Sequence, residues 1–161
     1  MTFLGNMFDI KGEEYLFKLN EFIRREQLPI EFVSLGKYTG KFKFGSGKGI
    51  IFAGEYDHGT VSQKLAQYET AIVAVLSIVP ETYCYTASEA ILSGYPVLSS
   101  NIGAQAARVQ KNKCGWVANL ISPDRGFAAL ENFLRYICTP EGRREILNRA
   151  AQTANFVNGT E

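Results

Sequence analysis

Two glutamates, Glu81 and Glu89, stand eight positions apart in IVPETYCYTASEA, which spans residues 78–90. An apolar run precedes them, so the pair follows a predicted strand and enters a predicted helix. The first turn of a helix offers free amide N–H groups, which together with the helix dipole bind anions such as a diphosphate. A carboxylate two turns on can accept two hydrogen bonds from the vicinal hydroxyls of a ribose. The same spacing also fits a simpler role, with Glu81 favourable near the helix N-terminus and Glu89 a solvated charge.

Lysines and a histidine supply further candidates. Lys11 follows the first predicted strand and can neutralise a phosphate, although a solvated lysine at a turn fits its position equally. The glycine-rich residues 40–49 fail the phosphate-loop pattern, because Phe42 stands at the first glycine position and Gly49 follows the lysine. We expect this segment to be a flap. His58, the only histidine, has no cysteine or histidine cluster beside it, so the sequence indicates no zinc site.

The whole chain has the composition of one globular domain. Its 161 residues are 46% hydrophobic and 12% aromatic, and its net charge is +1. These values argue against disorder, and the balanced charge argues against nucleic acid or an anionic membrane as a partner. The longest apolar run, residues 71–79, is too short to span a bilayer, and the first residues lack the pattern of a signal peptide. Three cysteines without metal spacing predict reduced thiols in a cytoplasmic protein.

Strand patterns and helix patterns alternate along the sequence. Predicted strands cover residues 2–4, 30–36, 50–54, 71–79, 96–100 and 115–118. Predicted helices cover residues 12–27, 62–69, 83–93 and 104–111, and two more helices end the chain. Thr139 is the expected cap of the last helix, with Pro140 at its first position. Its expected apolar face comprises Ile146, Leu147, Ala150 and Ala154.

This alternation predicts an α/β fold, a Rossmann-like open parallel sheet with helices on both faces, in one domain over residues 1–161. Residues 71–79 are apolar at successive positions, which is typical of a central strand covered on both faces. Ligands of such folds bind at the carboxyl ends of the strands. The segments that should contain the site are therefore residues 5–11, 36–49, 54–58, 80–85 and 99–104.

Four stretches, in order along nearly the whole chain, resemble the C-terminal domain of GT-B glycosyltransferases of family 4. They are FLGNMFDIKG, IIFAGEY, PETYCYTASEAILSGYPVLSSNIGA and NKCGWVA. Members often carry G-R-L-x-x-x-K-G at the first strand, and E-x7-E followed by E-A-x-x-x-G-x-P-V at the site of the sugar donor. Glu81 and Glu89 have the E-x7-E spacing, and the later residues of the pattern follow in register as Ala90, Gly94, Pro96 and Val97.

The resemblance implies a retaining glycosyltransferase of the hexosyltransferase type that uses a nucleotide-diphospho-sugar and needs no metal cofactor. It implies a catalytic pair in which Lys11 holds the diphosphate and Glu81 contacts the donor sugar. Glu89 is expected to bind the ribose hydroxyls, and Gly54 to Tyr56 are expected to line the nucleobase. The backbone amides expected to bind the diphosphate belong to Tyr83, Cys84 and Tyr85.

The resemblance also implies a missing partner domain. These enzymes have two domains, and the N-terminal domain, which binds a saccharide or lipid-linked acceptor, is absent from this sequence. We therefore expect the isolated chain to bind the sugar donor and to transfer nothing. The PETYCYTASEA form resembles enzymes of bacterial surface polysaccharide synthesis. We expect a cytoplasmic protein without a transmembrane segment or nucleic-acid partner, whose full-length form works at the inner membrane face.

Two positions depart from the family pattern and keep an alternative function open. Asn6 stands where the family has an arginine of the donor site, so one phosphate-binding cation is missing unless Lys43 or Lys48 replaces it. Cys84 stands where the family usually has a glycine. The alternative is a non-catalytic nucleotide-binding or interaction module derived from the same fold. A response-regulator receiver is disfavoured, because Asp9 stands alone after the first strand.

Overall fold

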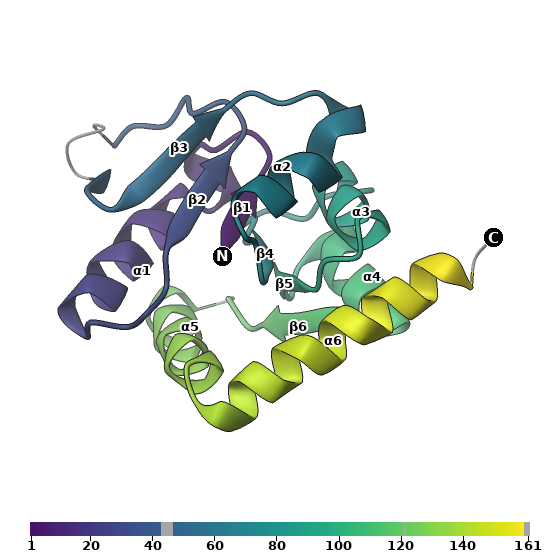
Figure 1. The fold of residues 1–161 in the computed structure, drawn as a ribbon. Helices are drawn as coiled ribbons and strands as arrows, with labels where there is room; N and C mark the ends of the chain where they lie inside the picture. The colour runs from purple at the N-terminus through teal and green to yellow at the C-terminus, as the bar shows by residue number, and fades with distance from the viewer. Residues whose placement is uncertain (43–46, 121, 160–161) are drawn as a thin grey trace.

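The computed structural model describes residues 1–42, 47–120 and 122–159. Over these residues the chain forms a six-stranded sheet in the order β3-β2-β1-β4-β5-β6, with every neighbouring pair parallel (Figure 1). The strands are β1 (Thr2–Leu4), β2 (Phe32–Leu35), β3 (Ile50–Gly54), β4 (Val73–Val75), β5 (Val97–Ser100) and β6 (Gly115–Ala118). The predicted open parallel sheet is confirmed. The strand order reverses between β1 and β4, which is the switch point where such sheets bind ligands.

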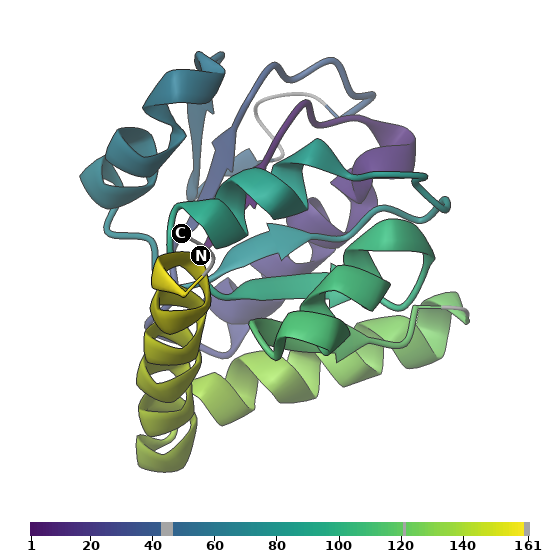
Figure 2. The same ribbon diagram turned by 90° about the vertical axis from the view of Figure 1, so that its right-hand side faces the viewer.

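Helices cover both faces of the sheet. They are α1 (Glu13–Arg25), α2 (Val61–Gln67), α3 (Tyr85–Leu92), α4 (Gly103–Asn112), α5 (Pro123–Ile137) and α6 (Pro140–Asn158), with short 3-10 turns η1 (Asp9–Lys11) and η3 (His58–Thr60). Helices α1 and α5 lie on one face, and α2, α3 and α4 lie on the other (Figures 1 and 2). Helix α6 begins beside α5 and runs across to α3, so it touches both layers.

Each face of the sheet has its own apolar core. Phe3 and Leu98 pack with α1 and α5 residues on one face, whereas Leu35 packs with α2 and α3 residues on the other. The central strand β4 contributes to both, since Ala74 belongs to the first cluster and its neighbour Val73 to the second. The two-sided burial confirms the expectation that a strand apolar at successive positions lies in the middle of the sheet.

Several elements are shorter than the sequence predicted, and two of these differences, in β4 and α3, have a visible cause. Strand β4 covers only Val73–Val75, because the chain then leaves the sheet at Ser77, whose single hydroxyl proton is shared between the carbonyls of Ile10 and Val79. Helix α3 begins at Tyr85 instead of residue 83. Cys84 has φ +61° and ψ +78°, a left-handed conformation that cannot continue a right-handed helix.

The last helix confirms its predicted cap and corrects its predicted face. The Thr139 hydroxyl accepts a hydrogen bond from the Gly142 amide at 3.1 Å, with Pro140 as the first helical residue. Leu147, however, is 70% exposed. Ile146 packs on the α1–α5 core instead, and Leu147, one position further round the helix, faces outward.

Candidate functional site

All strands are parallel, so the loops that follow them meet at one edge of the sheet, where two adjoining clefts lie. The first, the Glu89 cleft, has a volume of about 240 Å³. It is lined by Gly5, Asn6, Gly36, Glu55, Tyr56, His58, Tyr85, Thr86 and Glu89. The second, the Lys11 cleft, has about 40 Å³ and lies above β1 and β4. It is lined by Leu4, Gly5, Asn6, Met7, Lys11, Ala74, Val75, Leu76, Ser77, Glu81 and Thr86, so Gly5, Asn6 and Thr86 join the two.

The ends of β1, β2 and β3 are tied together beneath the Glu89 cleft. The Gly5 amide donates to the Leu35 carbonyl and the Gly36 amide donates to the Gly54 carbonyl, each at 2.8 Å. Gly36 has φ +139°, and a Cβ there would lie 2.2 Å from the Gly5 carbonyl oxygen. Only glycine permits this close approach. The floor of the cleft is therefore backbone packed on backbone.

Lys11 and Glu81 form an ion pair in the Lys11 cleft. The distance from Lys11 Nζ to Glu81 Oε1 is 2.7 Å, and the two side chains are 33% and 18% exposed. Lys11 ends the η1 turn after β1, and Glu81 lies in the loop after β4, so neighbouring strands of the switch point supply the two charges. Partial burial makes this pair stronger than an exposed one, because water screens it less.

Glu89 lies on the inner side of α3 and holds two partners from the loop after β3. The Tyr56 hydroxyl donates to Glu89 Oε2 at 3.0 Å, and His58 Nδ1 lies against Oε1. Burial, and then the adjacent Glu89 carboxylate, raise the pKa of Tyr56, so this hydroxyl stays protonated and donates at physiological pH. A diol that bound Glu89 would have to replace the exposed His58 ring on Oε1.

The turn into α3 leaves amide groups free to bind an anion. No hydrogen bond between described residues uses the N–H groups of residues 83–86. Among the described residues no α3 amide donates to the Glu81 carboxylate, which is paired with Lys11 instead. The free amides, the helix dipole and the Lys11 ammonium group together favour negative charge at this edge.

The structure brings most of the predicted site residues to this edge. Asn6, Lys11, Tyr56, Glu81, Tyr85 and Glu89 all line one of the clefts. Gly54 ends β3 just outside them and accepts the Gly36 amide. Cys84 is buried beneath the turn, with only 3% of its surface exposed. The Tyr83 ring points away from both clefts, into a groove lined by Ile91, Leu92, Arg108 and Phe156 among others.

Among the described residues, no lysine replaces the missing arginine in either cleft. Asn6 itself binds backbone, since its Oδ1 accepts the Lys37 amide at 3.2 Å. Among the described residues, Lys48 lines neither cleft; its carbonyl oxygen instead accepts the Asn20 side-chain amide at 3.0 Å. Lys43 lies outside the described residues. Lys11 is therefore the one cation that lines either cleft within the described part of the chain.

Sequence reasoning missed two cleft residues. His58 was expected only to lack a zinc cluster and was given no role, yet it lies against Glu89, which is thirty-one positions away in sequence. Thr86 joins the two clefts, and a Cβ at Gly5 would lie 2.6 Å from its methyl carbon. Neither residue is a defined position of a motif. Thr86 is one of the seven unspecified residues between Glu81 and Glu89, and only that placed it near the site.

No three histidine, cysteine, aspartate or glutamate side chains among the described residues gather closely enough to hold a metal ion. Within the same residues, no helix is long and apolar enough to cross a membrane.

Comparison with protein families gives one match over most of the chain. Residues 1–135 match the family model described as "Glycosyl transferases group 1". A search of curated proteins found no significant match.

Solved structures share the fold at low identity. Anabaena HepE in complex with UDP superposes with a TM-score of 0.68 and 18% identity, over 98% of this chain and 44% of that one. WaaG, "a glycosyltransferase involved in lipopolysaccharide biosynthesis", has a TM-score of 0.61 and 16% identity, over 97% of this chain and 43% of that one. The C-terminal domain of a group 1 glycosyl transferase, LpcC from Francisella tularensis, has a TM-score of 0.63 and 17% identity, over 98% of this chain and 83% of that one.

The coverage shows which part of these enzymes the chain corresponds to. The chain spans less than half the length of HepE and of WaaG, but most of the isolated LpcC C-terminal domain. The predicted likeness to a C-terminal GT-B domain is confirmed at the level of fold.

Proposed function

The chain belongs to the group 1 glycosyl transferases, and we propose that it forms the half of the active site that binds a nucleotide-diphospho-sugar. The observation that carries this proposal is the arrangement at the switch point of the sheet. A cation, a turn of free amides and a carboxylate that can accept hydrogen bonds from a diol lie along two joined clefts. A diphosphate with a ribose on one side and a sugar on the other needs those groups.

Each group then has a role in the bound complex. Lys11 and the amides of residues 83–86 take the diphosphate, and Glu89 accepts two hydrogen bonds from the ribose hydroxyls. Tyr56 and the backbone at Gly54 border the nucleobase. Glu81 contacts the sugar beside the diphosphate. HepE, which shares the fold, was crystallised with UDP, so UDP is the first nucleotide to test.

Transfer would depend on stabilising the leaving diphosphate. Negative charge grows on the diphosphate as the bond to the sugar breaks, and Lys11 together with the α3 N-terminus would stabilise that charge. This arrangement can operate without a metal ion. We propose that the transfer retains the configuration of the sugar and that the acceptor, a saccharide or a lipid-linked saccharide, binds to a second domain. A cytoplasmic role in bacterial surface polysaccharide synthesis belongs to the same proposal.

The binding part is tested by calorimetry on the 161-residue chain with UDP, GDP and ADP. We expect saturable binding of one nucleotide and a loss of at least tenfold in Glu89→Gln, since a charged hydrogen bond contributes about 1.5–3 kcal/mol. Glu141→Gln, an exposed glutamate on α6, is the matched control and should bind like the parent. An affinity that is unchanged in Glu89→Gln would contradict the proposed site.

One observation favours a second function, that of a nucleotide-binding module without catalysis. Asn6 replaces a family arginine and binds the Lys37 amide, so this edge carries less positive charge than the family pattern. The chain would then be a nucleotide-binding module without catalysis. Fusing the chain to an N-terminal acceptor domain of the family separates the two. Sugar transfer that Glu89→Gln abolishes supports the enzyme, whereas nucleotide binding without transfer supports the module.

A further inference from the structure

Arg108 on α4 contacts two residues of the turn that leads into α3 and one residue in the first turns of α3 itself. Its guanidinium donates to the Cys84 carbonyl oxygen at 3.1 Å and also donates to the Ser88 hydroxyl. The same guanidinium lies over the Tyr83 ring, 4.4 Å from the ring centroid. Both bonds come from Nη1, and arginine suits this position because its planar guanidinium can donate at its edge while its face stacks on an aromatic ring.

A second contact from α4 holds the other end of the same segment. The Ala104 amide, in the first turn of α4, donates to the Glu81 carbonyl oxygen at 2.9 Å. The carbonyl groups of Glu81 and Cys84 are therefore both turned toward α4. The amides of residues 83–86 make no hydrogen bond among the described residues. Helix α4 thus fixes the orientation of the peptide groups that the proposed function assigns to the diphosphate.

The turn needs such support because its backbone is unfavourable. Cys84 has φ +61°, a left-handed conformation that is unfavourable for a residue with a Cβ. A strained turn persists only where its surroundings hold it. The Arg108 bond to the Cys84 carbonyl acts on the strained residue itself.

We infer that Arg108 is a positioning residue, which holds the 83–86 amides in the orientation that binds the diphosphate of the sugar donor. The inference rests on the proposed function. Among the described residues Arg108 lines neither the Glu89 cleft nor the Lys11 cleft, so it acts through the turn and does not touch the ligand. It should therefore affect the diphosphate part of the binding and leave the nucleoside part unchanged.

The test compares UDP with uridine on the full chain, by calorimetry for UDP and ligand-detected NMR for uridine. If the nucleotide screen selects another base, the pair becomes GDP with guanosine or ADP with adenosine. The measured quantity is the preference for the diphosphate, the ratio of the two dissociation constants. The variants are Arg108→Met, which removes the bonds and the charge, and Arg108→Lys, which keeps the charge but lacks the planar group that stacks on Tyr83 and sets the direction of both bonds.

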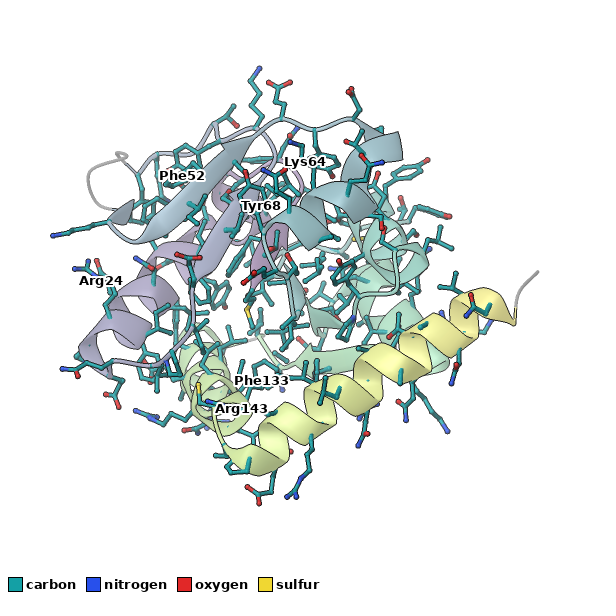
Figure 3. The ribbon with its side chains drawn as sticks, viewed as in Figure 1. Arg24, Phe52, Lys64, Tyr68, Phe133 and Arg143 are labelled. Atoms are coloured by element: carbon teal, nitrogen blue, oxygen red, sulfur yellow. The ribbon has the colours of Figure 1, made fainter. Side chains whose placement is uncertain are left out.

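Arg143→Met is the matched control, because it makes the same chemical change elsewhere. Arg143 is exposed at the start of α6, beside α5 and away from α3 (Figure 3). The Arg143→Met variant should prefer UDP over uridine as strongly as the parent does. Thermal unfolding of every variant shows whether the fold is intact, and Arg108→Lys decides the matter if Arg108→Met does not fold.

We expect Arg108→Met to lower the preference for the diphosphate about tenfold with uridine affinity unchanged, because a hydrogen bond to a charged group is lost. Arg108→Lys should lower it by several-fold. An unchanged preference in Arg108→Met, or a parental value in Arg108→Lys, overturns the inference and leaves the proposed function standing. Equal losses of UDP and uridine affinity also overturn it, since they indicate a general loss of structure. A parent chain that binds none of the three nucleotides overturns both.

Discussion

Lys11 and Glu81 form an ion pair at the switch point of the sheet, with Nζ and Oε1 2.7 Å apart although seventy positions separate them in sequence. Lys11 is the cation we assign to the diphosphate, and Glu81 is the carboxylate we assign to the sugar. In the free protein each therefore neutralises the other. A bound diphosphate would have to share Lys11 with Glu81 and would lie close to the charge of that carboxylate.

The pairing predicts opposite effects for substitutions at the two residues. Glu81→Gln should raise the affinity for UDP about threefold to tenfold, because it removes a negative charge beside the diphosphate and frees Lys11. Lys11→Met should lower that affinity by at least tenfold. Calorimetric titration with UDP measures both.

The control for this pair is another lysine–glutamate contact on the surface. Glu14→Gln breaks the exposed pair with Lys18 on α1, where Oε1 and Nζ are 2.6 Å apart. It should leave UDP binding unchanged. If Glu81→Gln weakens UDP as Lys11→Met does, the carboxylate orients the lysine instead of competing for it, and our reading of the pair is wrong.

At position 84 glycine should give a more stable protein than alanine, the reverse of their usual order in a helix. At Ala129, on the exposed side of α5, replacing alanine with glycine should cost about 1 kcal/mol of unfolding free energy. At residue 84, which has φ +61°, the Cys84→Gly variant should be more stable than Cys84→Ala by about 1 kcal/mol. Both variants lose the buried sulfur, so the comparison isolates the backbone. Urea unfolding measures the difference, and an alanine variant as stable as the glycine variant would show that the turn is unstrained.

Gly36 should tolerate no side chain. A Cβ there would lie 2.2 Å from the Gly5 carbonyl oxygen in a backbone with φ +139°, so the loops after β1 and β2 would have to separate. Gly36→Ala should lower the free energy of unfolding by about 3 kcal/mol or more. Gly59→Ala is the control, because a Cβ at Gly59 would meet no atom within 4 Å. Equal stability of the two variants would contradict the close packing described for the cleft floor.

The cysteines should differ in reactivity. Burial raises the pKa of the Cys114 thiol to about 11, and it raises the pKa of Cys84 as well, so neither forms much thiolate at pH 8. Cys138 is the least buried of the three, although burial also raises its pKa. Iodoacetamide at pH 8 should modify Cys138 first, and the other two only after unfolding. Mass mapping of early labelling at Cys84 or Cys114 would show that the α3 side of the core opens readily.

The sequence predicted the sheet well because its signals are local. Successive apolar residues in 71–79 placed the central strand, and Thr139 with Pro140 placed the start of α6. The sequence predicted the lengths of the strands and helices less well, since side-chain bonds to distant parts of the chain decide where they end. The chain leaves the sheet near Ser77, which donates to the Ile10 carbonyl, and no sequence pattern around residue 77 predicts this bond.

The sequence predicted most residues of the candidate site but not the contacts between them. The E-x7-E spacing and the position of Lys11 placed these residues at one edge, yet nothing local indicated that Lys11 and Glu81 form an ion pair. His58 and Arg108 lie on other loops and helices, and only the folded chain brings them to Glu89 and Cys84. Leu147 was expected in the core because helical spacing alone cannot tell which of two adjacent apolar residues faces inward.

The most direct measurement of the central claim compares UDP with 2′,3′-dideoxyuridine diphosphate, which lacks both ribose hydroxyls, on the parent chain and on Glu89→Gln. If Glu89 binds the ribose diol, the parent should prefer UDP by about tenfold or more, and the variant should lose most of that preference. The same preference in both proteins, or no UDP binding by the parent, would contradict the placement of the nucleotide in the Glu89 cleft.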